Sequence, residues 1–216
     1  MDLGEFDDYG RSDFWKRFSG WPLAIFLTAG LFAVYLPALR GGWLWDDNEW
    51  VVGNATLRTW EGLYAIWFEP RASPHYYPVT NTGFWIQYQL FGTTTTGYHV
   101  VNVLLHAAAA LLFWRLLKRL EIPGAGIAAA LFAFHPVNVE SVAWISEFKN
   151  TLSAVLSLSA ALVYLRFAGT ESPPVAGAAL PGHVPAVKSV GRRWPVWCLA
   201  SLLFLAALLS KTVVAT

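Results

Sequence analysis

Five apolar segments that are uncharged or nearly so divide the chain. They lie at about residues 21–39, 98–117, 124–140, 150–167 and 195–211. A bilayer core of about 30 Å needs roughly 20 apolar residues in a helix that rises 1.5 Å per residue. The third and fourth segments are short, and His135-Pro136 interrupts the third, so a re-entrant hairpin is an alternative for that pair. The pattern predicts an all-α, polytopic integral membrane protein with about five transmembrane helices.

The basic residues suggest how these helices are oriented. Lys and Arg gather before the first segment and in the connections after the second and the fourth, at Arg11, Lys16, Arg17, Arg115, Lys118, Arg119, Arg166, Lys188, Arg192 and Arg193. Short cytoplasmic connections carry an excess of Lys and Arg. We therefore expect residues 1–20 and the Gly-, Pro- and Ala-rich linker 168–193 in the cytoplasm, and the acidic connection 40–97 outside. The leader is long and acidic and no small-x-small site follows the first segment, which favours an uncleaved anchor over a signal peptide.

Composition agrees with a membrane protein and excludes other classes. Of the 216 residues 56% are apolar and 13% are charged, and the mean hydropathy is +0.43, whereas soluble domains carry about 25% charged residues. The 15 Lys and Arg nearly balance the 14 Asp and Glu, which argues against nucleic-acid binding. Cys198 is the single cysteine, so the chain has no internal disulfide and no cysteine-based metal cluster.

The outer connection 40–97 is too long to be structureless inside a compact unit. Several of its apolar residues recur at helical spacing, at Leu57, Trp60, Leu63, Tyr64, Trp67 and Phe68. With Arg58 and Glu61 on the opposite side, they predict one broad apolar face on a helix in the outer membrane interface, capped by Asn54 or Thr56. A simpler interpretation is that each aromatic residue only anchors the connection at the headgroups. Asn54 also begins a glycosylation sequon, although capping alone accounts for it.

Two adjacent carboxylates, Asp46 and Asp47, follow the first apolar segment. Adjacent like charges raise each other's proton affinity, so one member can act as a general base while the other orients it. Alternatively, the pair holds a divalent cation, or it is only a solvated turn. No other metal site is predicted.

Polar residues inside the second segment form one helical face. His99, Asn102 and His106 are spaced by three and four residues. Hydrogen bonds between helices are favoured over metal binding, because asparagine is a poor ligand and the two histidines lie about two turns apart.

A second set of polar residues is expected at the outer surface. Glu140 follows the break at His135-Pro136 and should arrive close to Asp46 and Asp47. Glu147, Lys149 and Asn150 extend this polar cluster, although such charges also serve as plain interfacial anchors. Lys211 follows the fifth segment, where it either neutralises a lipid phosphate or marks the interface.

These pieces occur in a specific order along the chain. The order is Trp45-Asp46-Asp47, Tyr76-Tyr77-Pro78-Val79, Gly97-Tyr98-His99-Val100-Val101-Asn102, Leu105-His106, the segment from His135-Pro136-Val137 through Glu140 to Ile145, Lys149-Asn150 and Leu209-Ser210-Lys211. From about residue 21 to 216 the chain resembles the amino-terminal half of bacterial GT-C membrane glycosyltransferases that carry tetratricopeptide repeats. Those enzymes are similar to the animal transmembrane and tetratricopeptide-repeat (TPR) protein O-mannosyltransferases. The resemblance implies that residues 21–216 are part of a larger transmembrane domain, with more spans and helical repeats after it.

The resemblance also implies a reaction. It is an inverting transfer of a sugar, with mannose as one candidate, from a polyprenyl-phosphate carrier to a protein hydroxyl at the outer face of a membrane, here the bacterial inner membrane. Asp46 or Asp47 would accept the hydroxyl proton, and Glu140 would orient a substrate. By the same resemblance, the residues that bind a substrate or the donor are His75, Tyr76, Tyr77, His135, Glu147, Lys149 and Lys211. A non-enzymatic membrane protein, such as half of a transporter or an assembly subunit, is the alternative.

Overall fold

The computed structural model describes residues 20–73, 75–168 and 194–212, and these residues form helices and connections without a strand. The α-helices are α2 (Trp21–Val34), α3 (Trp60–Phe68), α4 (Pro78–Phe91), α5 (Thr95–Arg119), α6 (Ala125–Phe134), α7 (Val139–Ala143), α8 (Phe148–Phe167) and α9 (Trp194–Ser210). The predicted all-α fold is confirmed. The proposed cytoplasmic segment 1–20 and linker 168–193 lie outside the described residues except at Gly20 and Ala168.

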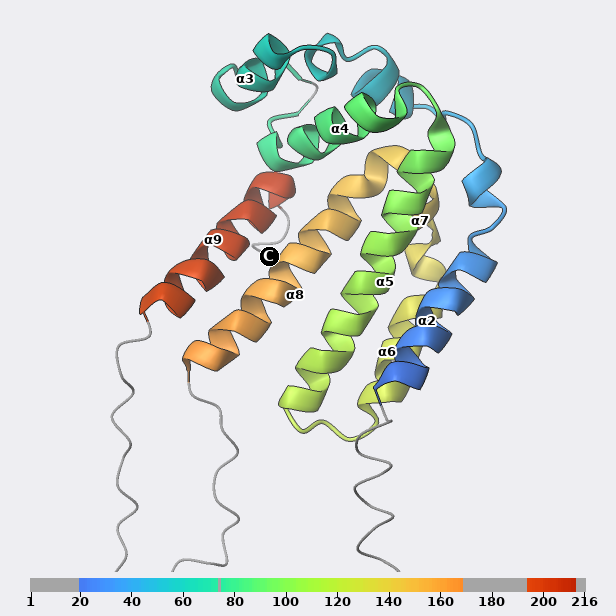
Figure 1. Ribbon diagram of the computed structural model, residues 1–216, viewed down its shortest axis with the longest axis vertical. Helices are drawn as coiled ribbons and strands as arrows, with labels where there is room; N and C mark the ends of the chain where they lie inside the picture. Colours follow the sequence, from blue (N-terminus) through green and yellow to red (C-terminus); the bar gives the residue numbers. More distant parts are fainter. Residues whose placement is uncertain (1–19, 74, 169–193, 213–216) are drawn as a thin grey trace, which may run out of the picture.

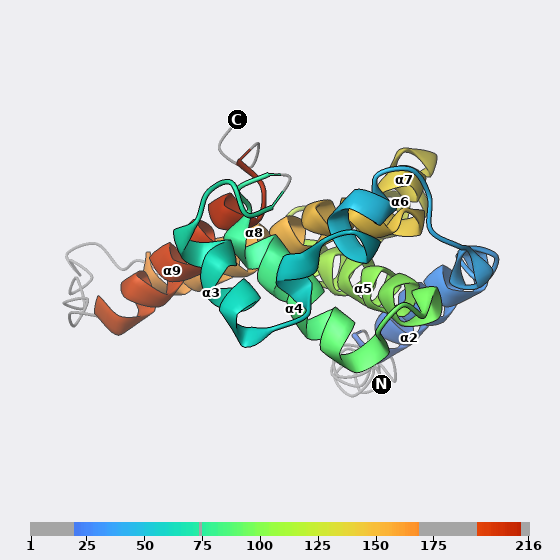
Figure 2. The same cartoon turned by 90° about the horizontal axis from the view of Figure 1, so that it is seen from above.

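The helices form a bundle with a second layer across one end. Helices α2, α5, α8 and α9 run side by side, and α3 and α4 cross above them (Figure 1). Seen from that end, α4 lies over the bundle (Figure 2), and it contacts α5, α8 and α9. Thr80 of α4 donates a hydrogen bond of 2.9 Å from Oγ1 to the carbonyl oxygen of Ser210 in α9. The connection 40–97 therefore folds back onto the end of the bundle.

Two of these helical segments are long and apolar enough to cross a membrane. They are Thr95–Arg119, with 25 residues, and Ile145–Phe167, with 23 residues. The bent pair α6 and α7 becomes a third if it counts as one span. Helices α2 and α9 are apolar but shorter, with 14 and 17 residues.

The predicted helix over 21–39 is too long. Helix α2 ends at Val34, where Tyr35 leaves the helical conformation. Pro37 follows two residues later and has no N–H to continue the helical hydrogen bonds. The chain turns instead through the 3-10 helix η1 (Ala38–Arg40).

The predicted break at His135-Pro136 is confirmed. Helix α6 ends at Phe134, and the pair Ala125–Phe134 and Pro136–Ala143 is bent by 47°. Asn138 stabilises the bend, because its Nδ2 donates to the carbonyl oxygen of Phe132 at 2.7 Å. The His135 side chain is used locally, since its Nδ1 accepts from the backbone N–H of Val137.

The polar face of α5 points into the protein. Asn102 Nδ2 donates to the carbonyl oxygen of Trp144 at 3.0 Å, and His106 Nε2 lies 2.9 Å from the carbonyl oxygen of Ala133 in α6. The predicted hydrogen bond between helices is thus confirmed for His106, and Asn102 bonds to the residue that follows α7. His99 is also buried, against the backbone of Gly41. A transport path along this face is not favoured, because these side chains are covered by protein.

Helix α3 is confirmed, but its predicted cap is wrong. Thr59 caps it, because Thr59 Oγ1 accepts from the N–H of Gly62 at 3.0 Å. Asn54 instead caps the preceding 3-10 turn η3 (Ala55–Leu57) through the N–H of Thr56 at 3.1 Å. The cap was misplaced because η3 separates Asn54 from the first turn of α3.

The apolar residues of the connection occupy two faces rather than one. Gly62 and Ile66 of α3 are buried against the protein, as is Leu57 in η3. The exposed aromatic side chains of α3 are those of Trp60, Tyr64, Trp67 and Phe68. Two of them also contact α4, because Trp67 Nε1 donates to Thr82 Oγ1 and the Trp60 ring lies against Trp85. We call these four residues the aromatic face of α3. The predicted apolar face is thus present on α3 for the four aromatic residues, whereas Leu57 is buried in η3. The buried face was not predicted because it uses the small residue Gly62, which carries no hydrophobic signal.

Helix α4 was not predicted. Its sequence mixes aromatic residues with Thr, Asn and Gln, so it lacks a clean apolar stripe. Its ends carried a usable signal, because Pro78 stands in the first turn and Gly92 follows the last turn at a φ of 56°.

Gly62 provides a test of how α3 is held. A Cβ at this position would lie 2.1 Å from the carbonyl oxygen of Thr56, which is backbone and cannot move without shifting η3. We expect Gly62→Ala to cost about 1–3 kcal/mol through overpacking and to speed trypsin cleavage after exposed Arg58 by roughly tenfold. The measurement is limited proteolysis of the detergent-solubilised protein.

The matched control is Gly42→Ala, because nothing lies within 4 Å of a Cβ built at Gly42. Its cleavage rate should equal that of the unmodified protein. Equal rates for the two alanine variants would contradict the tight packing of α3 on η3.

Candidate active site

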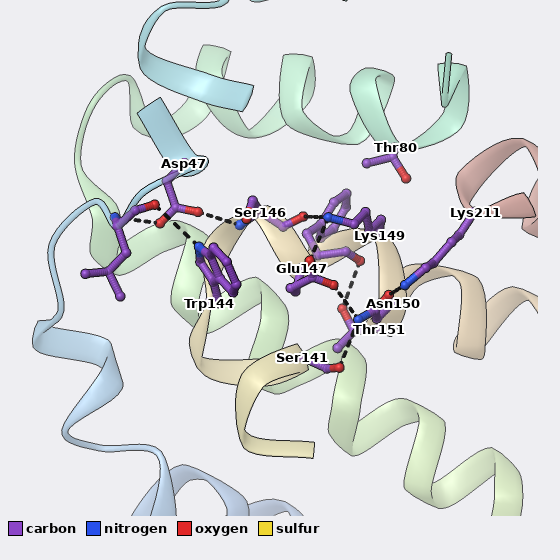
Figure 3. A network of polar contacts seen from close by, with 12 residues as sticks. Asp47, Thr80, Ser141, Trp144, Ser146, Glu147, Lys149, Asn150, Thr151 and Lys211 are labelled. Carbon is purple, nitrogen blue, oxygen red and sulfur yellow. Dashed lines mark hydrogen bonds and ion pairs between the residues drawn. The ribbon is translucent and has the colours of Figure 1, made fainter. Parts of the chain in front are cut away.

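Asp46 and Asp47 differ sharply in their surroundings. Asp46 is exposed, whereas Asp47 is 1% exposed. Both oxygens of the Asp47 carboxylate accept backbone N–H groups, from Leu44 at 2.9 Å and from Ser146 at 2.7 Å (Figure 3). Asp47 therefore links the turn 44–47 to the 3-10 helix η5 (Ile145–Glu147). Of the two carboxylates, that of Asp46 is the one in contact with solvent.

The electrostatics of Asp47 follow from its burial. Desolvation raises the pKa of the Asp47 carboxyl above its ordinary value, against the hydrogen bonds from Leu44 and Ser146 and the nearby His99, which lower it. Across the described part of the chain, no group of three or more His, Cys, Asp or Glu side chains is placed to hold a metal ion. A divalent cation at Asp46 and Asp47 stays a prediction.

Trp144 holds the same turn from the other side. Its indole Nε1 donates to the carbonyl oxygen of Leu44 at 3.4 Å, and its own carbonyl oxygen accepts from Asn102 of α5. The turn 44–47 is thus tied both to the long helix α5 and to the segment after α7. Asp46 is carried on a turn whose position is set by these contacts.

Glu140 lies in the groove that borders this turn. The groove has a volume of about 350 Å³ and is lined by Leu44, Trp45, Val139, Glu140, Ala143 and Trp144. Glu140 is exposed, and the walls of the groove are almost entirely apolar. Glu140 thus lines the same groove as Trp45, the residue before Asp46. His135 is not among the lining residues.

A second polar cluster lies on the other side of Ser146 (Figure 3). Lys149 Nζ lies 2.7 Å from Glu147 Oε1. Asn150 Nδ2 donates to Glu147 Oε2 at 2.5 Å, and Asn150 Oδ1 accepts from Lys211 Nζ. We call these four residues the lysine cluster. It brings together Glu147, Lys149 and Lys211, and Asn150, to which the sequence analysis gave no separate role, connects them.

Aromatic rings adjoin the lysine cluster. Lys149 Nζ lies 4.9 Å from the centre of the Trp50 ring. Trp50 stacks on Tyr77 at 6.3 Å and contacts His75 at 5.6 Å. His75 and Tyr77 are therefore near Lys149, as part of one group, whereas Tyr76 points elsewhere and donates from its hydroxyl to the carbonyl oxygen of Trp67. Trp50 was not predicted at this site, because it is one of several tryptophans in the chain and belongs to no distinctive pattern.

The lysine cluster carries a net positive charge. Its two lysines and one glutamate leave one positive charge by formal count, and the Glu147–Lys149 pair is only 14% and 13% exposed. Partial burial strengthens an electrostatic contact relative to one in water. This region is suited to an anionic group, whereas the region around Asp46 and Glu140 is suited to hydroxyl groups.

Comparison with known proteins finds protein O-mannosyl-transferases among the relatives of this chain. Protein O-mannosyl-transferase F38B6.6 of Caenorhabditis elegans is 36% identical over 146 residues, which cover 61% of this chain and 21% of that protein. Protein O-mannosyl-transferase Tmtc1 of Drosophila melanogaster is 29% identical over 195 residues, 85% of this chain and 20% of that protein. Human protein O-mannosyl-transferase TMTC3 is 29% identical over 150 residues, 65% of this chain and 16% of that protein.

The chain thus spans about one fifth of the length of these curated relatives. No protein-family model matches it, and no solved structure does.

Proposed function

We propose that this chain, a relative of the protein O-mannosyl-transferases, belongs to a membrane glycosyltransferase that transfers a sugar to protein hydroxyl groups. The observation that carries the proposal is the exposed carboxylate of Asp46 on a turn that Asp47 and Trp144 fix beside a groove. Sugar transfer to a hydroxyl requires a base that accepts the hydroxyl proton and a groove beside it that can hold a substrate.

The membrane arrangement we propose has five spans, formed by α2, α5, the bent pair α6 and α7, α8 and α9. The polarity of the bundle supports it. The last turn of α5 carries Lys118 and Arg119 at one end of the bundle, while α3 and α4 cover the other end (Figure 1). An excess of basic residues marks the cytoplasmic side. We therefore place Asp46 and the groove at the outer membrane surface, and the aromatic face of α3 among the headgroups.

The proposed chemistry is an inverting, GT-C-type displacement on a polyprenyl-phosphate-linked sugar. The acceptor hydroxyl gives its proton to Asp46 while its oxygen forms a bond to the anomeric carbon. The bond from that carbon to the carrier phosphate oxygen breaks, and the phosphate leaves with the electron pair. A phosphate is already a good leaving group, so a base and an offset of charge suffice. In this proposal Asp47 positions Asp46, and Glu140 accepts hydrogen bonds from a substrate.

The lysine cluster is the proposed site for the carrier phosphate. Lys149 and Lys211 provide the positive charge, and the rings of Trp50, His75 and Tyr77 border it. A phosphate would take its hydrogen bonds from the ammonium groups, which now bind Glu147 and Asn150.

The test is a transfer assay on the natural gene product reconstituted in phosphatidylcholine vesicles. The donors are radiolabelled mannosyl-phosphoryl-polyprenol and, separately, GDP-mannose, and the acceptor is a peptide rich in Ser and Thr. We expect label to reach the peptide from the lipid-linked donor with inversion at the anomeric carbon. Transfer from the nucleotide sugar alone, or from neither donor, would overturn the proposal.

Lys211 gives a sharper test of the phosphate site. We expect Lys211→Met to raise the KM for the lipid-linked donor roughly 10- to 100-fold with a smaller change in kcat, because a hydrogen bond to a charged group is worth about 1.5–3 kcal/mol. Steady-state kinetics in the same vesicles measure both constants. The control is Lys118→Met, because Lys118 lies at the end of the bundle away from the lysine cluster, with its Nζ 5.0 Å from the centre of the Trp114 ring. Its KM should be unchanged. An unchanged KM in the Lys211 variant would contradict the assignment.

A further inference from the structure

Trp45 has an unusual backbone for a bulky residue. Its φ is +37°, in the left-handed region, and its side chain is 83% exposed. Within the described residues, Glu121 is the other non-glycine residue with a positive φ. A large side chain adopts this conformation only where the surroundings impose it, and such residues cluster at functional sites.

The surroundings of Trp45 do impose it. The N–H of Leu44 donates to Asp47 Oδ2, and the N–H of Asp47 donates back to the carbonyl oxygen of Leu44 at 2.8 Å. The indole of Trp144 donates to the same carbonyl. Trp45 lies inside this closed turn, so the contacts on either side of it hold its indole out in solvent instead of letting it pack in the core.

The exposed indole forms one wall of a groove. Trp45 and Trp144 meet edge to face, with ring centres 5.8 Å apart and planes at 81°. The groove of about 350 Å³ beside them has almost entirely apolar walls, and Glu140 is the one charged residue among those that line it. Asp46, the next residue after Trp45, adds a second exposed carboxylate nearby.

This combination matches the chemistry of a sugar ring. A pyranose has an apolar face of C–H groups that packs on an indole, and a rim of hydroxyls that donate hydrogen bonds to carboxylates. A lipid headgroup phosphate fits less well, because two carboxylates would repel it. The walls are rigid, since Trp144 is fixed at both its ring nitrogen and its carbonyl oxygen.

We propose that the groove between Trp45 and Trp144 binds a pyranose ring, with the Trp45 indole against its C–H face and Glu140 and Asp46 at its hydroxyls. This inference rests on the proposed function and deepens it by separating two subsites. The sugar occupies the groove, and the carrier phosphate occupies the lysine cluster.

The experiment is saturation-transfer NMR with methyl α-D-mannopyranoside on the natural gene product in phosphatidylcholine nanodiscs. Trp45→Gly is the main variant, because glycine accepts a positive φ and so relieves the strained backbone. We expect it to weaken sugar binding by roughly tenfold or more while thermal stability is kept or raised. Trp45→Phe should retain part of the binding, since it keeps an aromatic face.

Trp60→Ala is the matched control, because it removes another exposed indole, 72% exposed, from the aromatic face of α3. It should leave sugar binding unchanged. Equal binding in the unmodified protein and Trp45→Gly, or equal losses in Trp45→Gly and Trp60→Ala, would overturn the inference.

Two further readouts separate the outcomes. Brominated phosphatidylcholine quenches the fluorescence of tryptophans that contact lipid. The fraction of tryptophan fluorescence that it quenches should therefore not fall in Trp45→Gly. A lower fraction in this variant would assign Trp45 to the headgroups instead. If Trp45→Gly keeps both sugar transfer and sugar binding, the proposal of a sugar site in the groove is overturned and the proposed function still stands. Sugar binding at Trp45 without transfer from any donor supports the groove and overturns the function.

Discussion

Replacing Asp46 with Asn is expected to reduce sugar transfer by about 10²- to 10⁴-fold, the usual loss when a general base is removed. Asn has nearly the same shape as Asp but cannot take up the acceptor proton. Asp46 is exposed, so the substitution should leave the thermal unfolding temperature unchanged. The loss should fall mainly on kcat, because proton transfer occurs in the transition state. The measurement is steady-state transfer from the lipid-linked donor.

The control is Glu49→Gln, which neutralises another exposed carboxylate in the same connection, in the π-helix η2 (Asn48–Val52). It should transfer sugar at the unmodified rate. If the Asp46 variant also keeps full activity, Asp46 is not the base. Glu140→Gln would then be the next variant to measure, because Glu140 is the carboxylate that lines the neighbouring groove.

Replacing Asp47 with Ala is expected to destabilise the protein and, through that, to reduce transfer. It removes the acceptor for two backbone N–H groups, of Leu44 and of Ser146. A buried donor left without a partner costs about 1–3 kcal/mol. The unfolding temperature of the detergent-purified protein should therefore fall by several degrees, in contrast to the Asp46 variant.

Asp47→Asn separates the two effects. The Asn side chain keeps one acceptor oxygen, but its NH₂ group faces a backbone N–H where the second carboxylate oxygen accepted a hydrogen bond. The unfolding temperature of this variant should therefore lie between those of the unmodified protein and the Ala variant. Full stability of the Ala variant combined with complete loss of transfer would contradict a positioning role and make Asp47 the base.

Local patterns predicted part of this fold. Helix α5 and the bend at His135-Pro136 follow from a long apolar run and from the chemistry of proline. The approach of Glu140 to the turn that carries Asp46 followed from the order of the segments. Helix α4 was missed because its residues mix polar and aromatic types, and only its terminal Pro78 and Gly92 marked it.

The site depends on contacts that no local pattern contains. Nothing in the pair Asp46-Asp47 distinguishes its members, because the difference comes from Ser146, which is 99 residues away in the sequence. The grouping of Trp50 with Lys149 and Tyr77 likewise depends on how the connection 40–97 folds back over α8. Sequence reasoning could name the charged residues but could not assign them to two separate places.

The hydrogen bond between Asp47 and Ser146 also constrains the order of events during biosynthesis. Its partners are 99 residues apart, and at about 5–20 residues per second the second partner is made roughly 5–20 s after the first. The turn that carries Asp46 lacks this anchor until α5, α6 and α7 have been made. A nascent chain that stops before η5 therefore has the acidic pair without the hydrogen bond that buries Asp47 against Ser146, and the proposed activity would begin only after that stage of translation.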